Sequence, residues 1–276
     1  MNLLGIDFED WYHPELIQQT LGKEKKIPKV INGLDKILDL LRKNETFATF
    51  FVVGELIEFR PEIQDKILND GHEIGFHTMY HTNLNKMNSE CFDNEVKRFA
   101  EITNKKSRGF RAPTFSLNSN TSWSIDILER NNYIYDSSMV PAKTGMYGDP
   151  NAEIKPYKIS SSSLSRDDPA AKIIEFPLMI TSFLGRKIPT GGGFFLRTLP
   201  FKITKKAIYN YQKKHIPSTF YVHSWELTPE FMPRIKLTKR DNFITYHNIQ
   251  KVMKRMNELL SNFQFTSFEK YLNKIN

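Results

Sequence analysis

Short apolar runs alternate with helix-like segments along the first half of the chain. Buried strands are predicted at residues 2–8, 46–53, 73–76, 109–111 and 133–135. Helices are predicted over residues 34–41, 61–68, 89–102 and 125–128, where apolar side chains recur on one helical face. Strands and helices that alternate with short connections are typical of an α/β fold with a parallel sheet. About five such units in the first 136 residues favour a barrel over an open sheet.

The second half follows this rhythm less closely. Residues 141–170 are rich in Pro, Gly, Ser and Asp and are interpreted as a long surface insertion. Strands are predicted at 172–176 and 219–222, helices at 204–213 and 248–260, an apolar segment at 263–268, and a flexible turn at 190–193. We therefore expect one domain over residues 1–276, with the insertion and a C-terminal helical extension from about residue 228.

Composition narrows the class of protein. Of the 276 residues, 39% are hydrophobic and 25% charged, which is ordinary for a globular protein. The net charge of +8 indicates either a surface with spare lysines or attraction to an anionic partner, such as a membrane face, a lipid-linked sugar donor or an acidic polysaccharide. No nucleic-acid module accompanies the charge, so nucleic acid is not an expected partner. Cys91 is the only cysteine, which excludes an intramolecular disulfide and a cysteine zinc site.

Targeting signals are not expected. Acidic residues occupy positions 7, 9 and 10, where a signal peptide would keep an uncharged apolar core. No run of about 18 apolar residues is present to span a bilayer. A cytoplasmic location is therefore expected, with peripheral contact at the inner face of the membrane as an extension of the charge argument.

Polar side chains recur at one kind of position. Each lies at or just past the C-terminal end of a predicted strand: Asp7, His77, Arg111, Asp136 and His223. In a β/α barrel, the C-terminal ends of the strands form the face that carries the active site. These five groups therefore predict a reaction site at that face.

Two of the strand ends carry donor groups for a metal ion. His77 and His81 are four residues apart and can share one divalent metal, most simply zinc, which then needs at least one oxygen ligand. The first strand ends in three carboxylates, of which one can bind the metal while another acts as general base. Strand alternation puts Asp7 and Glu9 on the same side, so Glu9 is the first choice of ligand and Asp10 the second. A helix-capping acid and a surface histidine pair are the alternative interpretations.

The flanking sequence adds a resemblance. Residues 71–82, GHEIGFHTMYHT, closely resemble the second motif of the polysaccharide deacetylases, the NodB-type carbohydrate esterases. Further segments resemble later motifs of that family in the same order: Phe110–Pro113, Tyr135–Ser138 and Phe220–His223. The match covers roughly residues 3 to 226. It implies a distorted, NodB-like barrel of about seven parallel strands.

The wider pattern is similar to one bacterial subgroup of that family, found with exopolysaccharide and surface-glycan biosynthesis. Its Asp-x-Glu-Asp-Trp opening is present at residues 7–11, in place of the usual adjacent pair of aspartates. A Gly-Gly-Gly-aromatic turn follows at residues 191–194, and a His-x-Trp-Glu motif at 223–226. The altered opening leaves the acidic metal ligand open between Glu9 and Asp10.

The resemblance implies a mechanism for removing N-acetyl groups from amino sugars. Asp7 would act as general base, Arg111 would pair with it, and His223 would act as general acid. His77, His81 and either Glu9 or Asp10 would hold the metal. The backbone amide around Thr114 would stabilise the oxyanion, with Asp136 in the pocket wall. Trp225 is a candidate sugar-stacking residue by its side-chain type, with core packing as the alternative interpretation. A polysaccharide, or its lipid- or nucleotide-linked precursor, would be the substrate.

Three other functions stay open. A metal-dependent amidohydrolase acting on a small non-peptide amide or cyclic imide would use the same groups. A catalytically silent glycan-binding protein need not keep acid, base and metal ligands together, so the full set counts against it. A basic nucleic-acid-binding domain is the least expected, and it would bind with strong salt dependence.

Overall fold

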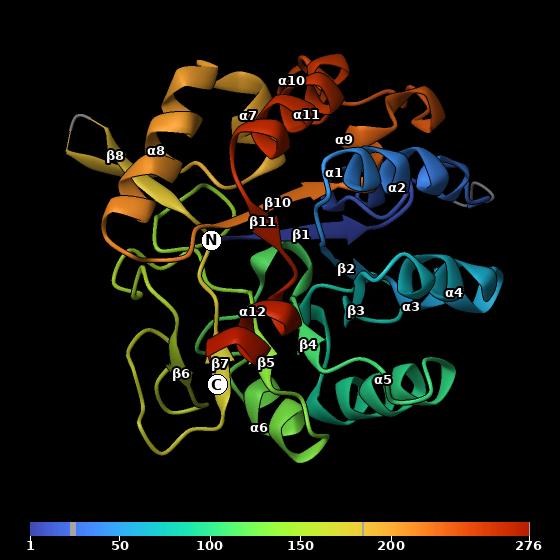
Figure 1. Ribbon diagram of the computed structural model, residues 1–276. Coiled ribbons are helices and arrows are strands. Elements are labelled where there is room, and N and C mark those ends of the chain that lie inside the picture. Colours follow the sequence, from blue (N-terminus) through green and yellow to red (C-terminus); the bar gives the residue numbers. More distant parts are fainter. Residues whose placement is uncertain (23–25, 184, 276) are drawn as a thin grey trace.

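The computed structural model describes residues 1–22, 26–183 and 185–275, and it is built around one curled sheet (Figure 1). The strands are β1 (Asn2–Phe8), β2 (Thr49–Val52), β3 (Glu73–Phe76), β4 (Gly109–Phe110), β5 (Tyr135–Asp136), β6 (Tyr157–Ile159), β7 (Ile173–Glu175), β8 (Ile180–Phe183), β9 (Arg186–Pro189), β10 (Thr219–His223) and β11 (Phe265–Thr266). The sheet order is β10-β1-β2-β3-β4-β5-β7-β6. All of these pair in parallel except β6, which is antiparallel to β7.

Helices cover the outside of this sheet (Figure 1). They are α1 (Glu15–Gln18), α2 (Leu34–Lys43), α3 (Gly54–Phe59), α4 (Glu62–Asn69), α5 (Ser89–Ile102), α6 (Trp123–Arg130), α7 (Gly193–Thr198), α8 (Phe201–Lys213), α9 (Ser224–Leu227), α10 (Lys239–Tyr246), α11 (Val252–Asn262) and α12 (Phe268–Ile275). The expected α/β fold, a distorted barrel of about seven parallel strands, is confirmed, and its curled, mostly parallel sheet forms a half-barrel.

Strand alternation divides β1 and β2 between two cores. The side chains of Ile6, Phe8 and Phe50 belong to the large apolar core that also includes buried residues of the outer helices. The intervening positions, such as Gly5, Asp7 and Phe51, face the inside of the barrel, where Gly5 and Phe51 both lie against the guanidinium of Arg111. Because the C-terminal ends of parallel strands lie at the same edge of the sheet, polar groups that follow different strands lie close together at that edge, inside the barrel.

The end of the chain is part of the barrel. β11 pairs in parallel with β1, and the following α12 brings Phe268 against Phe51 and Tyr135 inside the barrel. The Phe268 and Tyr135 rings stack 5.2 Å apart with an interplanar angle of 6°. The C-terminal helical extension from about residue 228 stays a prediction; in the structure the apolar residues of its last part fill the N-terminal end of the barrel.

Close packing, not flexibility, explains the run of glycines at 191–193. A Cβ at Gly191 would meet the carbonyl oxygen of Thr219 at 2.4 Å, and one at Gly192 would meet the Tyr221 ring at 2.6 Å. A Cβ at Gly193 would lie 1.8 Å from a carboxylate oxygen of Glu226. The predicted flexible turn is therefore wrong, since all three glycines are buried where backbone and side chains approach too closely for any other residue.

Residues 141–170, interpreted from the sequence as a long surface insertion, form a largely irregular segment that also adds β6 to the edge of the sheet.

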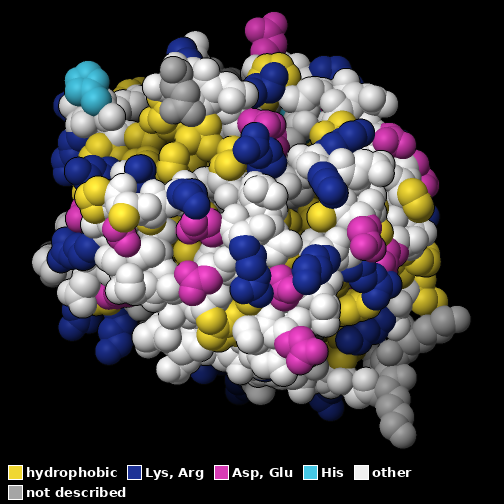
Figure 2. All heavy atoms as spheres, turned by 90° about the horizontal axis from the view of Figure 1, so that it is seen from below, with side chains coloured by type: hydrophobic (Ala, Val, Ile, Leu, Met, Phe, Trp, Pro, Cys, Tyr) yellow, Lys and Arg dark blue, Asp and Glu magenta, His cyan; other side chains and the backbone are white. Residues whose placement is uncertain are grey.

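The face seen in Figure 2 carries Lys and Arg side chains interspersed with Asp and Glu, so the positive charge is not gathered there into one patch. Among the helices of the described residues, none is long and apolar enough to cross a membrane.

Candidate active site

Four strands bring charged side chains together at the C-terminal edge of the sheet. Asp7 on β1 lies beside His223 on β10 in the sheet register. His77 follows β3 and Arg111 follows β4, both directly after their last strand residue. Asp7, His77 and Arg111 are each at most 2% exposed, so little solvent screens the electrostatic interactions between them.

A buried ion pair joins Asp7 to Arg111. Arg111 Nη1 donates to Asp7 Oδ1 at 2.6 Å, and its remaining donors reach the Ser137 carbonyl at 3.0 Å and hydroxyl at 2.9 Å. The guanidinium also lies over the Phe51 ring, 4.2 Å from its centroid. Gly5 leaves the space for it, because a Cβ there would approach Nη1 to 2.6 Å. This arrangement holds one oxygen of Asp7 and leaves the other directed toward the pocket.

That second oxygen faces the histidines. His77 Nε2 lies 4.0 Å from Asp7 Oδ2, while His77 Nδ1 lies 2.7 Å from the Arg111 carbonyl oxygen. A carbonyl only accepts, so Nδ1 carries the proton and Nε2 keeps its lone pair. Burial lowers the pKa of His77 to about 4, which keeps the ring neutral at pH 7. The His81 ring lies 4.9 Å from it, in a loop where Thr78 and His81 both have positive φ angles.

Glu9 lies at the centre of the site. Its Oε2 is 2.9 Å from His81 Nε2, and its Oε1 accepts from the Trp225 indole at 2.8 Å and lies 3.6 Å from His223 Nε2. Burial alone would raise the pKa of Glu9, but the neighbouring His81 and His223 lower it below its ordinary range. The carboxylate is therefore ionised and surrounded by imidazoles.

These donors fit a zinc ion by type and partly by spacing. Two imidazoles and a carboxylate make a zinc site with an open position. The 2.9 Å between His81 and Glu9 is near the ~3.3 Å that separates two ligands each about 2.0 Å from a tetrahedral ion. His81 Nδ1 and Glu9 Oε2 are buried without a hydrogen bond within the described residues. Among the described residues, no group of three or more His, Cys, Asp or Glu side chains is close enough to form a preformed metal cluster.

Asp10 has a different role from Glu9. Its carboxylate accepts hydrogen bonds from the backbone N–H groups of Trp11, Lys29 and Ile31, at 2.9 to 3.2 Å. The Asp10 N–H in turn donates to His13 Nδ1 at 2.8 Å. With its oxygens directed at three amides and none lining the pocket, Asp10 holds the loop after β1, and it does not meet the histidines as the sequence had allowed.

His223 is held by a chain of buried charges. Its Nδ1 lies 2.8 Å from Glu226 Oε2, and Arg197 Nε donates to Glu226 Oε1 at 2.8 Å. Burial lowers the pKa of His223, but the Glu226 carboxylate outweighs burial and raises it to about 9. Glu226 itself has a pKa of about 2, because His223 and Arg197 overcome the effect of burial. His223 is therefore protonated near pH 7 and directed toward the pocket.

Two members of this network of buried charges were not predicted as site residues from the sequence. Glu226 was noted only as part of the His-x-Trp-Glu motif, and Arg197 was not singled out. The available signal was Gly193, whose missing side chain makes room for the Glu226 carboxylate. Arg197 is 1% exposed and also donates to the His247 carbonyl at 2.7 Å, but its partners are 29 and 50 residues away in sequence.

The remaining residues that were predicted to contact substrate have different roles. Some line the pocket, and others hold neighbouring side chains in position. The pocket has a volume of about 260 Å³ and is lined by site residues and by Thr114, Phe194 and Tyr147. Thr114 has left-handed backbone angles, φ 55° and ψ 25°. Trp225 lines the pocket, but its ring stacks on His223 at 4.8 Å and its N–H is bound to Glu9, so it positions these two groups.

Asp136 lies behind the pocket wall, not on it. It is fully buried and accepts from the Ser138 hydroxyl at 2.7 Å. Burial raises its pKa, although hydrogen bonds from Glu175 and Ser138 oppose this. The predicted contact of Asp136 with substrate is therefore not supported by its position.

Two family models match the chain. Residues 28–133 match the model described as polysaccharide deacetylase, and residues 137–273 match a domain of unknown function, DUF3473. The curled sheet runs through both matched regions, since β2 to β4 lie in the first and β6, β7 and β10 lie in the second.

Curated relatives match over part of their length. A peptidoglycan-N-acetylglucosamine deacetylase from Bacillus cereus is 44% identical over 70 residues, which is 25% of this chain and 26% of the relative. A chitooligosaccharide deacetylase from Rhizobium leguminosarum bv. trifolii is 35% identical over 66 residues, covering 24% of this chain and 31% of the relative. The matches thus span only about a quarter to a third of these two proteins.

Solved structures share the fold over the whole chain. A candidate polysaccharide deacetylase from Mycobacterium smegmatis superposes with a TM-score of 0.59 at 15% identity, covering 99% of this chain and 90% of that one. A CE4 family pseudoenzyme from Bacillus anthracis gives a TM-score of 0.50 at 13% identity, covering 99% of this chain and 65% of the other. At these identities the likeness concerns the fold alone.

Proposed function

We propose, from the match of residues 28–133 to the polysaccharide deacetylase model, that this chain hydrolyses N-acetyl groups of amino sugars in a bacterial glycan. Water attacks the acetyl carbonyl, the C–N bond breaks, and acetate and a free amine leave. The relatives named peptidoglycan-N-acetylglucosamine and chitooligosaccharide deacetylases support this reaction class.

One observation carries the proposal. A carboxylate and a protonated imidazole lie in the same small pocket, each held by its own buried partner. Asp7 is bonded to Arg111 at 2.6 Å, and His223 lies 2.8 Å from Glu226. Carboxylate and imidazolium in separate environments are what general acid–base hydrolysis needs near neutral pH.

The residues divide the proton transfers between them. Asp7 Oδ2, the oxygen not bonded to Arg111, accepts the proton of the attacking water. His223 Nε2 faces the pocket while Nδ1 is bonded to Glu226, so Nε2 delivers its proton to the departing amine. Backbone N–H groups near Thr114 are suited to stabilising the oxyanion of the tetrahedral stage.

His77, His81 and Glu9 would hold a divalent metal, with zinc as the best match to two imidazoles and a carboxylate. Such an ion polarises a carbonyl and lowers the pKa of bound water toward neutrality. The neutral ring of His77, whose pKa burial lowers to about 4, is ready to bind a cation without first losing a proton.

The direct test is acetate release from N-acetylglucosamine oligomers by metal-stripped, zinc-restored and Asp7→Asn protein. We expect release to return with zinc and to fall about 10²- to 10⁴-fold in the variant, the range of a lost general base. Asp126→Asn, an exposed aspartate on α6, is the matched control and should keep full activity.

Other outcomes would support the rival functions. Release from cyclic imides but not from acetylated sugars would indicate an amidohydrolase of another substrate class. Oligomer binding without any acetate release would indicate a glycan-binding protein. If zinc restores nothing and Asp7→Asn equals the wild type, the proposed chemistry is wrong.

The charge of +8 supports one further part of the proposal, peripheral contact with an anionic membrane that carries the glycan or its lipid-linked precursor. The protein would then work at the inner face of the membrane. Sedimentation with anionic vesicles should weaken steeply between low and high salt. Binding that ignores salt, or equal binding to neutral vesicles, would exclude the electrostatic contact.

A further inference from the structure

The excess positive charge comes from one stretch of the sequence. Residues 176–225 contain eight Lys and Arg side chains and no Asp or Glu, whereas the rest of the chain contains 31 basic and 31 acidic side chains. The net charge of +8 is therefore the charge of this stretch alone. In the fold it forms the β8–β9 hairpin, α7, α8 and β10.

Helix α8 presents a stripe of this charge to solvent. Lys202, Lys206, Tyr209 and Lys213 are exposed, and their spacing of three or four residues places them on one face of the helix. The opposite face packs into the apolar core through buried residues such as Ile208. The exposed stripe therefore carries three lysines and one aromatic ring.

An ordinary surface helix of this protein mixes the two signs of charge. On α5, four acidic side chains accompany Lys97 and Arg98, and Lys97 pairs with Asp93 at 2.7 Å. Helix α8 has no acidic residue, so it cannot form such pairs within itself. Lys205, at the border of the stripe, pairs with Glu258 of α11 at 3.0 Å, but the three lysines of the stripe make no ion pair with any described residue. Their charge is therefore not balanced within the described part of the protein.

The β8–β9 hairpin extends the charged surface beside this helix. The Ile180 N–H donates to the Tyr211 hydroxyl of α8 at 3.1 Å, and the hairpin projects from the barrel beside α8 (Figure 1). Phe183, on β8, is 53% exposed, and the exposed Arg186 and Lys187 lie on β9. An exposed aromatic ring near basic side chains is typical of segments that lie in the headgroup region of a membrane. We call Phe183, Arg186, Lys187 and the three lysines of the stripe the basic face.

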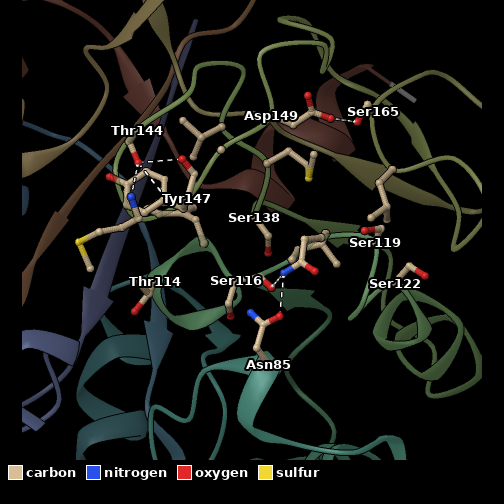
Figure 3. Close-up of a pocket in the computed structure, with 18 of the residues that line it drawn as sticks. Asn85, Thr114, Ser116, Ser119, Ser122, Ser138, Thr144, Tyr147, Asp149 and Ser165 are labelled. Carbon is tan, nitrogen blue, oxygen red and sulfur yellow. Dashed lines mark hydrogen bonds between the residues drawn. The ribbon is translucent and has the colours of Figure 1, made fainter. Parts of the chain in front are cut away.

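The basic face adjoins the wall of the candidate active site. Lys187 Nζ donates to the Pro150 carbonyl at 2.7 Å, which joins the hairpin to the loop of residues 143–150. In that loop the Thr144 hydroxyl donates to the Tyr147 carbonyl at 2.7 Å (Figure 3), and both residues line the catalytic pocket. Met146, between them in sequence, is 43% exposed. A flat surface that rests on the hairpin would therefore lie beside the wall of that pocket.

We infer that the basic face docks on an anionic lipid membrane, with Phe183 entering the headgroup layer. The inference rests on the membrane contact proposed above and deepens it by naming the surface and the side chain that make it. Anionic headgroups match cations that have no acidic partner in the protein, and a projecting hairpin fits a flat surface. Single-stranded nucleic acids, in contrast, are bound along basic grooves.

The test measures sedimentation of the full chain with vesicles of mixed phosphatidylglycerol and phosphatidylcholine, and with vesicles of phosphatidylcholine alone. Each Lys or Arg near an anionic surface strengthens binding about fivefold. The triple variant Lys202→Gln, Lys206→Gln, Lys213→Gln should therefore bind the anionic vesicles about 10²-fold more weakly than the wild type. Neither protein should bind the neutral vesicles comparably.

A second triple variant is the matched control. Lys43→Gln, Lys105→Gln, Lys106→Gln removes the same charge from exposed lysines outside the basic face. It should keep the affinity of the wild type to within about threefold, because charges more than a Debye length from the membrane are screened. Equal weakening in the two triple variants would show that net charge alone drives binding, and it would overturn the inference while leaving the proposed membrane contact in place.

Insertion of Phe183 has its own readout. Phe183→Ser should weaken binding to the anionic vesicles about tenfold, since part of an aromatic side chain is no longer buried. In Phe183→Trp, lipids with brominated acyl chains should quench the added emission. Phe59→Trp, at a position on α3 where Phe is 57% exposed, should show no such quenching. Equal quenching at the two positions, or none at 183, would contradict insertion.

Acetate release from soluble N-acetylglucosamine oligomers separates docking from the reaction. The stripe variant should keep the wild-type rate, because none of its three lysines lines the catalytic pocket. Vesicle binding as expected, with no acetate release by the wild type, would overturn only the reaction. Wild-type vesicle affinity in the stripe variant would overturn the inference. Binding of DNA or polygalacturonate without binding of anionic vesicles would overturn it as well and would assign the basic face to another polyanion.

Discussion

Buried carboxylates of the half-barrel respond to burial in opposite ways, according to their partners. At the N-terminal edge, Glu73 accepts from the Tyr135 hydroxyl at 2.6 Å and from the Glu269 N–H at 3.0 Å, and burial raises its pKa to about 7. At the C-terminal edge, Glu9 and Glu226 are as buried, yet their pKa values are lowered. The difference lies in the partners, since neutral donors surround Glu73 whereas imidazoles and a guanidinium surround the other two.

This difference teaches how one sheet separates stability from chemistry. A carboxylate without a cation loses more from desolvation than hydroxyl bonds return, so it tends to keep its proton. Pairing with buried cations keeps the charge and makes an acid–base site, although replacing such pairs by apolar groups often costs no stability. The end sealed by α12 is a structural core, and the open end is suited to reaction.

Among the paired carboxylates of the C-terminal edge, the largest loss of stability is expected when Arg111 is removed. Arg111→Met leaves Asp7 as an uncompensated buried charge, and we expect unfolding to become about 3–5 kcal/mol easier. Urea denaturation measures this, with Arg130→Met, an exposed arginine on α6, as the control that should change little. Equal midpoints for the two variants would show that the Asp7 pair is not tightly coupled to folding.

Glu73, at the N-terminal edge, should make the free energy of unfolding depend on pH. Because the pKa of Glu73 is raised from 4.5 to about 7, the folded state binds the proton more tightly. This contribution is fully present below pH 4.5 and is lost as pH rises through 7, by about 3 kcal/mol. Glu73→Gln should therefore gain stability relative to the wild type as pH goes from 5 to 8. Parallel stability curves for the two proteins would contradict this.

The two candidate acidic ligands can be separated by their partners. Glu9→Gln should weaken zinc binding more than about 100-fold, beyond what loss of an outer contact costs. Asp10→Asn should leave zinc affinity nearly unchanged and lower stability instead, since its carboxylate holds three backbone amides. A competition titration with a zinc chelator measures the affinities, and a reversed order would assign the metal to Asp10.

The smallest expected effect concerns the contact with Glu226 that orients the His223 ring. Gly193→Ala places a methyl group 1.8 Å from the Glu226 carboxylate, so Glu226 must move and His223 loses its orientation. Displacements of about 1 Å can cost up to 10²-fold, and we expect kcat to fall tenfold or more while the fold persists. Gly22→Ala, where a Cβ meets nothing within 4 Å, is the matched control. Full activity in Gly193→Ala would show that the glycine serves packing alone.

Local pattern determined much of the outer framework. Residues 2–8 and 73–76 form β1 and β3 as predicted, and α5 spans Ser89–Ile102 from the predicted start. Such elements are readable because their apolar spacing is set by neighbours in sequence. The short helices α3 and α7 and the β8–β9 hairpin were not predicted, since little in their composition distinguishes them from loops.

The sequence by itself determined where the chemistry would lie, at the ends of parallel strands, and which residue types would meet there. Only the tertiary structure decided their partnerships. It separated Glu9 from Asp10, joined Arg197 to Glu226 and gave Gly193 its purpose. The physical reason is that burial and pairing depend on groups far apart in sequence, such as Glu9 and Trp225, which are 216 residues apart. Their approach is fixed by how the sheet closes and not by any local spacing.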